Sequence, residues 1–305
     1  MDIQRIGIVG AGVIGASWAA FYLSKGFDVV ATDPAPEADT RLRDALAAFL
    51  GDDAATLSSR LTFDADLSSA LRGVDFVQEN GPERLELKRA LYRQMDDLLP
   101  EHVPIASSSS GLKISDIQTA CTRHPERCLV AHPFNPPHLI PLVELVGGAA
   151  TGKDVIARVK RFYDALGKET IVLNKEMPGH VANRLAAALF REVYHLVGEG
   201  VVNVADADKA VAWGPGLRWG LMGQCLTYHL GGGEGGMAHF LEHLSGPMTS
   251  WWDDLGTPSF DADVDRRMID ELRAIQGDRT IQALAAERDR LLIELIEARR
   301  HSFLP

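Results

Sequence analysis

A histidine and a glutamate twelve residues apart are the side chains of this chain best suited to acid–base chemistry. His132 ends one short apolar run, and Glu144 lies inside the next. A carboxylate in an apolar strand is costly unless it is paired, and a nearby imidazole would supply the partner. The carboxylate would orient the ring and leave the second nitrogen free as a base. Taken alone, His132 also fits a core histidine and Glu144 a solvated edge-strand acid.

Four consecutive serines, residues 107–110, follow another apolar run. In open α/β sheets, ligands bind beyond the carboxyl ends of the strands, and we expect these hydroxyls at such an edge. By itself the serine run also fits a flexible turn. We infer a role in ligand binding for the serines only in combination with the acid–base pair and a cofactor site.

The first fifteen residues predict that cofactor site. An apolar run at 4–9 leads into Gly-Ala-Gly-Val-Ile-Gly at residues 10–15, and a helix follows. Gly10 permits a tight turn, Gly12 lets the backbone approach a pyrophosphate, and Gly15 lets the helix pack closely on the strand. The positive end of the helix then faces the phosphates. The residues expected to bind the cofactor here are Gly10, Gly12, Val13, Ile14 and Gly15.

An acid at the end of the second expected strand indicates which dinucleotide binds. Asp33 ends the run at 27–32. A carboxylate at this place accepts hydrogen bonds from both hydroxyls of the adenosine ribose and repels a 2′-phosphate. No arginine follows at 34–36. The sequence therefore predicts NAD rather than NADP, the alternative being a glycine turn that binds something else or nothing.

The elements that must position these residues divide the chain in two. Strand-like and helix-like runs alternate through the first half, which predicts a doubly wound, mostly parallel sheet. Beyond residue 179 the strand signals fade and helical patterns take over, including an expected helix at 229–244. We therefore expect a Rossmann-like α/β domain at 1–179, followed by a smaller all-α domain at 180–305. The expected strands of the first domain are 4–9, 27–32, 74–78, 104–107, 127–131, 142–146 and 170–173.

Composition narrows the classes of partner. The chain of 305 residues carries a net charge of −11 and shows no basic patch, which argues against nucleic acid and anionic membranes as partners. Its three cysteines have no metal-ligand spacing and suggest a reducing compartment. No apolar run is long enough for a membrane span. We expect a cytoplasmic protein without a metal.

Longer motifs resemble the 3-hydroxyacyl-CoA dehydrogenase family over nearly the whole chain. The most specific is His-Pro-Phe-Asn-Pro, with a glutamate twelve residues after the histidine. Within the family, the chain is similar to the branch of lambda-crystallin (L-gulonate 3-dehydrogenase) and L-carnitine dehydrogenase. The segments that carry the resemblance are 77–88, 107–111, 131–137, 140–146 and 178–185.

The resemblance implies a role for individual residues. His132 falls on the general base of the family and Glu144 on its partner. Ser110 and Asn183 fall on residues that hold the substrate oxygen. The family's Asn-Thr-Ser-Ser is Ser-Ser-Ser-Gly here, at residues 108–111, so Ser109 remains the alternative to Ser110.

Two further positions and the oligomeric state also follow from the resemblance. Glu83 and Lys88 fall on positions near the nicotinamide half of the cofactor. Family members are dimers through the helical domain, which implies a homodimer here. The apolar stripe at 281–296 has helical spacing and fits either that contact or the core of its own domain.

The substrate implied is a short L-3-hydroxy acid. Arg218, in a glycine-rich segment, can clamp a carboxylate, although a loop arginine often pairs with a surface acid. A carnitine-like substrate also carries a quaternary ammonium, which aromatic faces and an acid hold well. Two adjacent tryptophans equally fit a core or a dimer contact. The candidates for this group are Tyr228, Glu234, Trp251 and Trp252.

The sequence thus predicts NAD-dependent oxidation of the 3-hydroxyl of a carnitine-like acid to the 3-oxo acid. L-gulonate-type sugar acids and short 3-hydroxyacyl-CoA esters are the alternatives, although no lysine cluster offers a groove for CoA phosphates. A crystallin-like structural protein that binds NAD is the non-enzyme alternative. The joint presence of Ser110, His132, Glu144 and Asn183 argues against a silent site.

Overall fold

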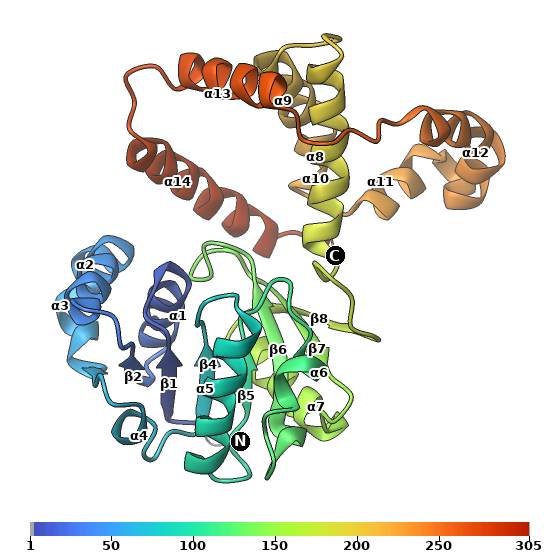
Figure 1. Ribbon diagram of the computed structural model, residues 1–305. Coiled ribbons are helices and arrows are strands. Elements are labelled where there is room, and N and C mark those ends of the chain that lie inside the picture. The colour runs from blue at the N-terminus through green and yellow to red at the C-terminus, as the bar shows by residue number, and fades with distance from the viewer. Residues whose placement is uncertain (1–2, 305) are drawn as a thin grey trace. The chain divides into compact units, whose positions relative to one another are not determined.

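The computed structural model describes residues 3–304, and the chain forms two compact units, residues 1–183 and 184–305. The expected domain boundary between residues 179 and 180 stays a prediction. Helix α8 (Ala182–Gly198) carries the chain from one unit to the next, and Figure 1 shows the strands gathered before it and helices alone after it. Each unit is described by itself.

The first unit is built on one eight-stranded sheet with the strand order β3-β2-β1-β4-β5-β6-β7-β8. Every neighbouring pair is parallel except β6 and β7, which run antiparallel. The predicted doubly wound, mostly parallel sheet is confirmed. The strands are β1 (Arg5–Val9), β2 (Asp28–Thr32), β3 (Leu61–Phe63), β4 (Phe76–Glu79), β5 (Ile105–Ser107), β6 (Cys128–Pro133), β7 (Leu142–Gly147) and β8 (Glu169–Leu173).

Helices cover both faces of this sheet, so its central strands are buried almost throughout. One buried cluster joins the sheet to α1, α2 and α7, and a second joins the opposite face to α4, α5 and α6. Strand β3 has no counterpart among the expected strands, because three residues are too few to show a period. The helices are α1 (Val13–Ser24), α2 (Ala38–Leu50), α3 (Ala54–Leu57), α4 (Leu67–Ala70), α5 (Leu85–Leu98), α6 (Ile114–Gln118) and α7 (Lys153–Ala165).

The second unit contains helices only within its described residues, as expected. Its buried core is small and consists of Val197, Val204 and Ala207, with three partly buried neighbours. Neither α13 nor α14 has a fully buried side chain. After α8 the helices are α9 (Val204–Trp213), α10 (Pro215–Trp219), α11 (Gln224–Gly231), α12 (Gly236–Asp254), α13 (Ala262–Gln276) and α14 (Ile281–Arg300).

The prediction of a single helix at 229–244 is wrong. The structure has two helices there, α11 and α12, separated by a short 3₁₀ turn. Gly233 and Gly236 both adopt a φ of 58°, in the left-handed region that a continuous helix does not use. The glycine run at 231–236 therefore breaks the helical pattern that the apolar residues on either side suggest.

Candidate active site

His132 and Glu144 form a hydrogen-bonded pair across two strands of the first unit. They stand directly opposite each other in the antiparallel register of β6 and β7, so their side chains share one face. The Nδ1 atom of His132 lies 2.8 Å from Oε2 of Glu144, and the residues are 5% and 0% exposed. The carboxylate accepts this bond, so Nδ1 carries the proton. The other nitrogen, Nε2, makes no hydrogen bond within residues 3–304 and is free to accept a proton.

Backbone groups at the start of α8 hold the second oxygen of Glu144. The N–H groups of Val181 and Ala182 donate to Oε1 at 2.9 and 3.0 Å. Burial by itself would raise the pKa of Glu144, but the hydrogen bonds from His132 and from these two N–H groups outweigh it and hold the pKa below its ordinary value. Glu144 is therefore a fixed carboxylate. The sequence analysis missed this pair of donors.

Three of the four serines are already engaged by side chains near the end of β4. Each hydroxyl donates one short hydrogen bond: Ser107 to Glu79 at 2.7 Å, Ser108 to Asn80 at 2.7 Å and Ser109 to Glu83 at 2.6 Å. Ser110 is exposed, and its hydroxyl makes no hydrogen bond within the described part of the chain. Three serines are therefore engaged in holding the loop, and the hydroxyl of Ser110 is available to a ligand.

Glu83 holds the loop that carries Ser110 in place through three hydrogen bonds. Its Oε1 accepts hydrogen bonds from the Ser109 hydroxyl and from the backbone N–H groups of Gly111 and Leu112, at 2.6, 2.8 and 3.1 Å. Burial would raise the pKa of Glu83, yet these donors and the nearby Lys88 lower it. Glu83 therefore stays ionised and holds both sides of the serine loop.

Lys88 is buried in an ion pair that the sequence analysis did not foresee. Its Nζ lies 2.7 Å from Oε1 of Glu79 and 3.0 Å from the carbonyl oxygen of Gly81, and it is 3.9 Å from Glu83. Glu79 also accepts from the N–H of Gly81 at 2.6 Å. These bonds join the end of β4 to α5. A contact between Lys88 and the cofactor stays a prediction.

Asn183 is the second residue of α8 and is half-buried. It directly follows Ala182, whose N–H group anchors Glu144. Its amide makes no hydrogen bond within residues 3–304. Like Ser110, Asn183 therefore offers an unengaged donor.

The glycine turn has the shape that a dinucleotide needs. A Cβ on Gly10, whose φ is 91°, would lie 2.8 Å from the backbone of Asn80, and one on Gly15 would lie 1.9 Å from the Gly10 carbonyl oxygen. Apart from the adjoining backbone, no atom of residues 3–304 lies within 4 Å of the corresponding position on Gly12. The first turn of α1, with Val13 exposed and Ile14 half-buried, has no side-chain cap. Open space in front of uncapped N–H groups fits a pyrophosphate.

Asp33 lies beside this turn, just beyond β2. Its Oδ2 accepts from the N–H of Ala11 and its Oδ1 from the N–H of Ala35, both at 2.8 Å. Each carboxylate oxygen has a second lone pair, so both can still accept a ribose hydroxyl. The residues present fit NAD.

The candidates for the quaternary ammonium of the substrate are spread over the second unit. Tyr228, in α11, stacks on Phe240 of α12, with ring centroids 4.3 Å apart. Trp251 and Trp252 lie near the other end of α12 and are 59% and 64% exposed. Eleven residues separate Phe240 from Trp251, which is about 16 Å along a helix. The structure therefore does not bring Tyr228 together with the tryptophans.

The remaining two predicted substrate residues are solvent-exposed. Arg218 lies in α10 and forms no ion pair within the described residues. Glu234 lies in the 3₁₀ turn between α11 and α12. Both side chains are available to a ligand, and their roles stay predictions.

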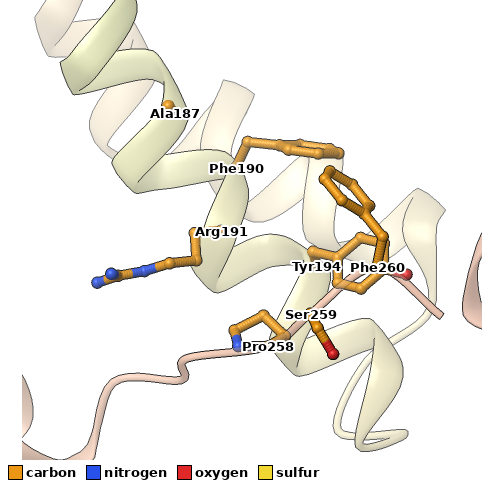
Figure 2. A pocket seen from close by; sticks show the side chains of 7 residues that line it. All are labelled: Ala187, Phe190, Arg191, Tyr194, Pro258, Ser259 and Phe260. Atoms are coloured by element: carbon orange, nitrogen blue, oxygen red, sulfur yellow. The ribbon is translucent and has the colours of Figure 1, made fainter. Parts of the chain in front are cut away.

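The second unit also contains an aromatic pocket that the sequence analysis missed. Its volume is about 250 Å³. The rings of Tyr194 and Phe260 are 5.3 Å apart, and those of Phe190 and Tyr194 are 6.2 Å apart. Figure 2 shows the three rings gathered on one side, with Arg191 extending away from them. The full lining is Ala187, Phe190, Arg191, Tyr194, Pro258, Ser259 and Phe260.

Two family models match the chain. Residues 5–177 match the NAD binding domain of 3-hydroxyacyl-CoA dehydrogenase, and residues 179–271 match its C-terminal domain. Among similar proteins, an L-carnitine dehydrogenase of Streptomyces coelicolor is 44% identical over 97% of this chain and 95% of its own length. Another from Pseudomonas putida is 40% identical over 99% of this chain and 95% of its own length.

Solved structures agree with these matches. A 5-formyl-3-hydroxy-2-methylpyridine 4-carboxylic acid 5-dehydrogenase, described as an NAD⁺-dependent dismutase, has a TM-score of 0.82 and 29% identity over 98% of this chain and 99% of that one. The 3-hydroxybutyryl-CoA dehydrogenase of Escherichia coli K12 has a TM-score of 0.65 and 28% identity over 70% of this chain and 46% of that one.

Proposed function

Since the chain belongs to the 3-hydroxyacyl-CoA dehydrogenase family and is an NAD-dependent oxidoreductase, we propose that it oxidises the 3-hydroxyl of L-carnitine to a 3-oxo acid. The full-length likeness to L-carnitine dehydrogenases supports the substrate. The buried pair of His132 and Glu144, with Nε2 of the imidazole free, is the single observation that carries the chemistry.

His132 is the proposed general base. Its Nε2 takes the proton of the substrate hydroxyl while NAD, when bound, supplies the acceptor for the hydride that leaves C3. Glu144 keeps the proton on Nδ1 and stabilises the imidazolium that forms. Its lowered pKa supports this role, because a carboxylate held ionised by three hydrogen bonds is negative before the ring becomes charged.

Ser110 and Asn183 are the proposed donors to the substrate oxygen. That oxygen gains negative character as its proton leaves, and preorganised donors stabilise the charge. Support for Ser110 over Ser109 comes from their hydrogen bonds, because the Ser109 hydroxyl is committed to Glu83. Asn183 has an equally unengaged amide.

The proposed cofactor site comprises the glycine turn and Asp33. The N–H groups of Gly12, Val13 and Ile14 would meet the pyrophosphate, and Asp33 would accept the adenosine ribose hydroxyls. Glu83 and Lys88 would support the nicotinamide side by holding the serine loop and the end of β4 in place.

We propose the aromatic pocket as the site of the quaternary ammonium, with Arg191 extending away from its three rings (Figure 2). Three rings line it together, whereas Tyr228 lies in α11 and the two tryptophans lie near the far end of α12. The hydroxyl of Tyr194 donates to Asp265 at 2.8 Å, which places an acid next to the rings. Aromatic faces hold such a cation by about 0.5–2 kcal/mol. Arg218, exposed and without an ion pair among the described residues, is the proposed partner of the substrate carboxylate.

We propose a homodimer formed through the second unit. Apolar side chains of α14 such as Ile281, Leu291 and Ile293 are exposed, and the unit's own buried core is small. These exposed apolar side chains are the support for an interface on α14. No helix within residues 3–304 is long and apolar enough to cross a membrane. Three free cysteines support the proposal of a cytoplasmic location.

A spectrophotometric assay of NADH formation tests the function. The panel holds L-carnitine, L-gulonate, 3-hydroxybutyrate and its CoA ester, each with NAD and with NADP. We expect the highest kcat/KM for L-carnitine with NAD. A higher kcat/KM for L-gulonate or the CoA ester would contradict the proposed substrate, and no NADH from any of the four would contradict the proposed activity.

A further inference from the structure

A second histidine lies against His132 in the first unit. The ring of His180 is buried, and its centroid is 5.0 Å from that of His132 at an interplanar angle of 46°. Its Nε2 lies 3.0 Å from the carbonyl oxygen of Ser109. Because a carbonyl oxygen only accepts, Nε2 must carry the proton. One imidazole therefore touches the ring of His132 and holds the peptide that leads into Ser110.

The backbone around His180 supports the partner of His132. Gly179 and His180 have φ values of 74° and 50°, so two consecutive residues are left-handed, a conformation that a residue with a Cβ avoids. Directly after this turn, the N–H groups of Val181 and Ala182 point at Oε1 of Glu144. The turn thus places its side chain near His132 and its following backbone on Glu144.

Packing alone does not explain an imidazole at residue 180. Its Nδ1 is buried and has no hydrogen-bond partner within residues 3–304. A phenylalanine would fill the same space without leaving an unpaired acceptor, whose burial is unfavourable. The bond from Nε2 to Ser109 is the only contact described for this side chain that a phenylalanine would lose.

We propose that His180 is a positioning residue for the reaction. It fixes Ser110 through the carbonyl of Ser109 and braces the ring of His132 from the side. This inference rests on the proposed function, which assigns Ser110 as a donor and His132 as the base. Small displacements of such groups lower turnover strongly while leaving cofactor binding intact.

Two substitutions separate the hydrogen bond from the ring. His180→Phe keeps the ring and removes the donor, whereas His180→Gln places an amide N–H near the position of Nε2. We expect His180→Phe to lower kcat about tenfold or more with the KM for NAD unchanged, and His180→Gln to recover most of the loss. His102→Phe, on an exposed turn, is the matched control and should behave as the parent.

Three outcomes would overturn the proposal. The first is a His180→Phe variant that turns over as fast as the parent. The second is a His180→Gln variant as impaired as His180→Phe. The third uses ¹⁵N-detected imidazole resonances of the parent chain, which we expect to report the His180 proton on Nε2; a proton on Nδ1 would contradict the bond to Ser109. This third readout applies even if a variant fails to fold, and it needs no turnover. A parent chain inactive on every hydroxy acid would instead count against the proposed function.

Discussion

The two compact units differ in how many side chains they bury and in how they pair the charged ones. The first unit buries charged side chains in pairs, such as Glu144 with His132 and Glu79 with Lys88, and adds backbone donors to each carboxylate. The second unit has a small buried core and leaves Trp251, Trp252 and Phe260 largely exposed. The first unit therefore sets its reactive groups by its own contacts, whereas the second has surface still to be covered by ligand or by another copy.

The largest expected effect follows from removing the base in the first unit. We expect His132→Ala to lower kcat about 10²–10⁴-fold, because the substrate proton loses its acceptor. The affinity for NADH, measured by fluorescence titration, should stay within a few-fold of the parent. Near-parental turnover would show that the paired groups of the first unit are structural only.

A smaller loss is expected when the free serine is changed. Ser110→Ala should lower kcat about 10²-fold, the usual scale for losing one donor to a developing oxyanion. Ser109→Ala is the matched variant, and it should lower the melting temperature instead, because it removes a partly buried hydrogen bond to Glu83. A larger loss of kcat in Ser109→Ala than in Ser110→Ala would reverse the assignment of the serines.

A substitution in the second unit should affect binding rather than chemistry. We expect Phe260→Ala to raise the KM for L-carnitine about tenfold, because the cation loses one aromatic face. The KM for 3-hydroxybutyrate, which lacks the quaternary ammonium, is the control and should change far less. Equal changes for the two substrates would remove the pocket from substrate recognition.

The smallest expected effect concerns the pH dependence of stability in the first unit. Burial, with Lys25 nearby, lowers the pKa of Lys168 to about 7, and its Nζ donates to the carbonyls of Pro137 and Ile140 in the loop between β6 and β7. In the unfolded chain this lysine stays protonated up to its ordinary pKa of 10.5. The unfolded state therefore binds more protons between these values, and stability gained from this residue rises with pH across that window.

Lys168→Met should remove that dependence. Differential scanning fluorimetry of parent and variant at about pH 6 and about pH 9 measures it. We expect the parent to gain in melting temperature relative to the variant on going to the higher pH. An unchanged difference between the two proteins would mean that Lys168 has an ordinary pKa in the folded chain.

The glycine turn and the pairing of His132 with Glu144 could be predicted from the sequence, because local rules determine them. The glycine turn and Asp33 lie at the ends of two short apolar runs, and His132 and Glu144 belong to neighbouring strands. The shape of the dinucleotide turn and the fold class agree with those expectations.

The remaining features depend on contacts between distant segments. The donors of Val181 and Ala182 reach Glu144 only because two residues before them are left-handed. The engagement of three serines by side chains from the end of β4 is set by the order of the strands in the sheet. The aromatic pocket joins α8 to residues 258–260, which no local pattern indicates.

In this account, His132 and Glu144 act in the reaction as one unit. A double-mutant cycle on kcat with His132→Ala, Glu144→Ala and the two together tests it most directly. Groups that act as one unit lose their effect together, so the double variant should turn over as fast as His132→Ala alone. Losses that multiply, with the double variant slower than His132→Ala by the full factor of Glu144→Ala, would contradict this account.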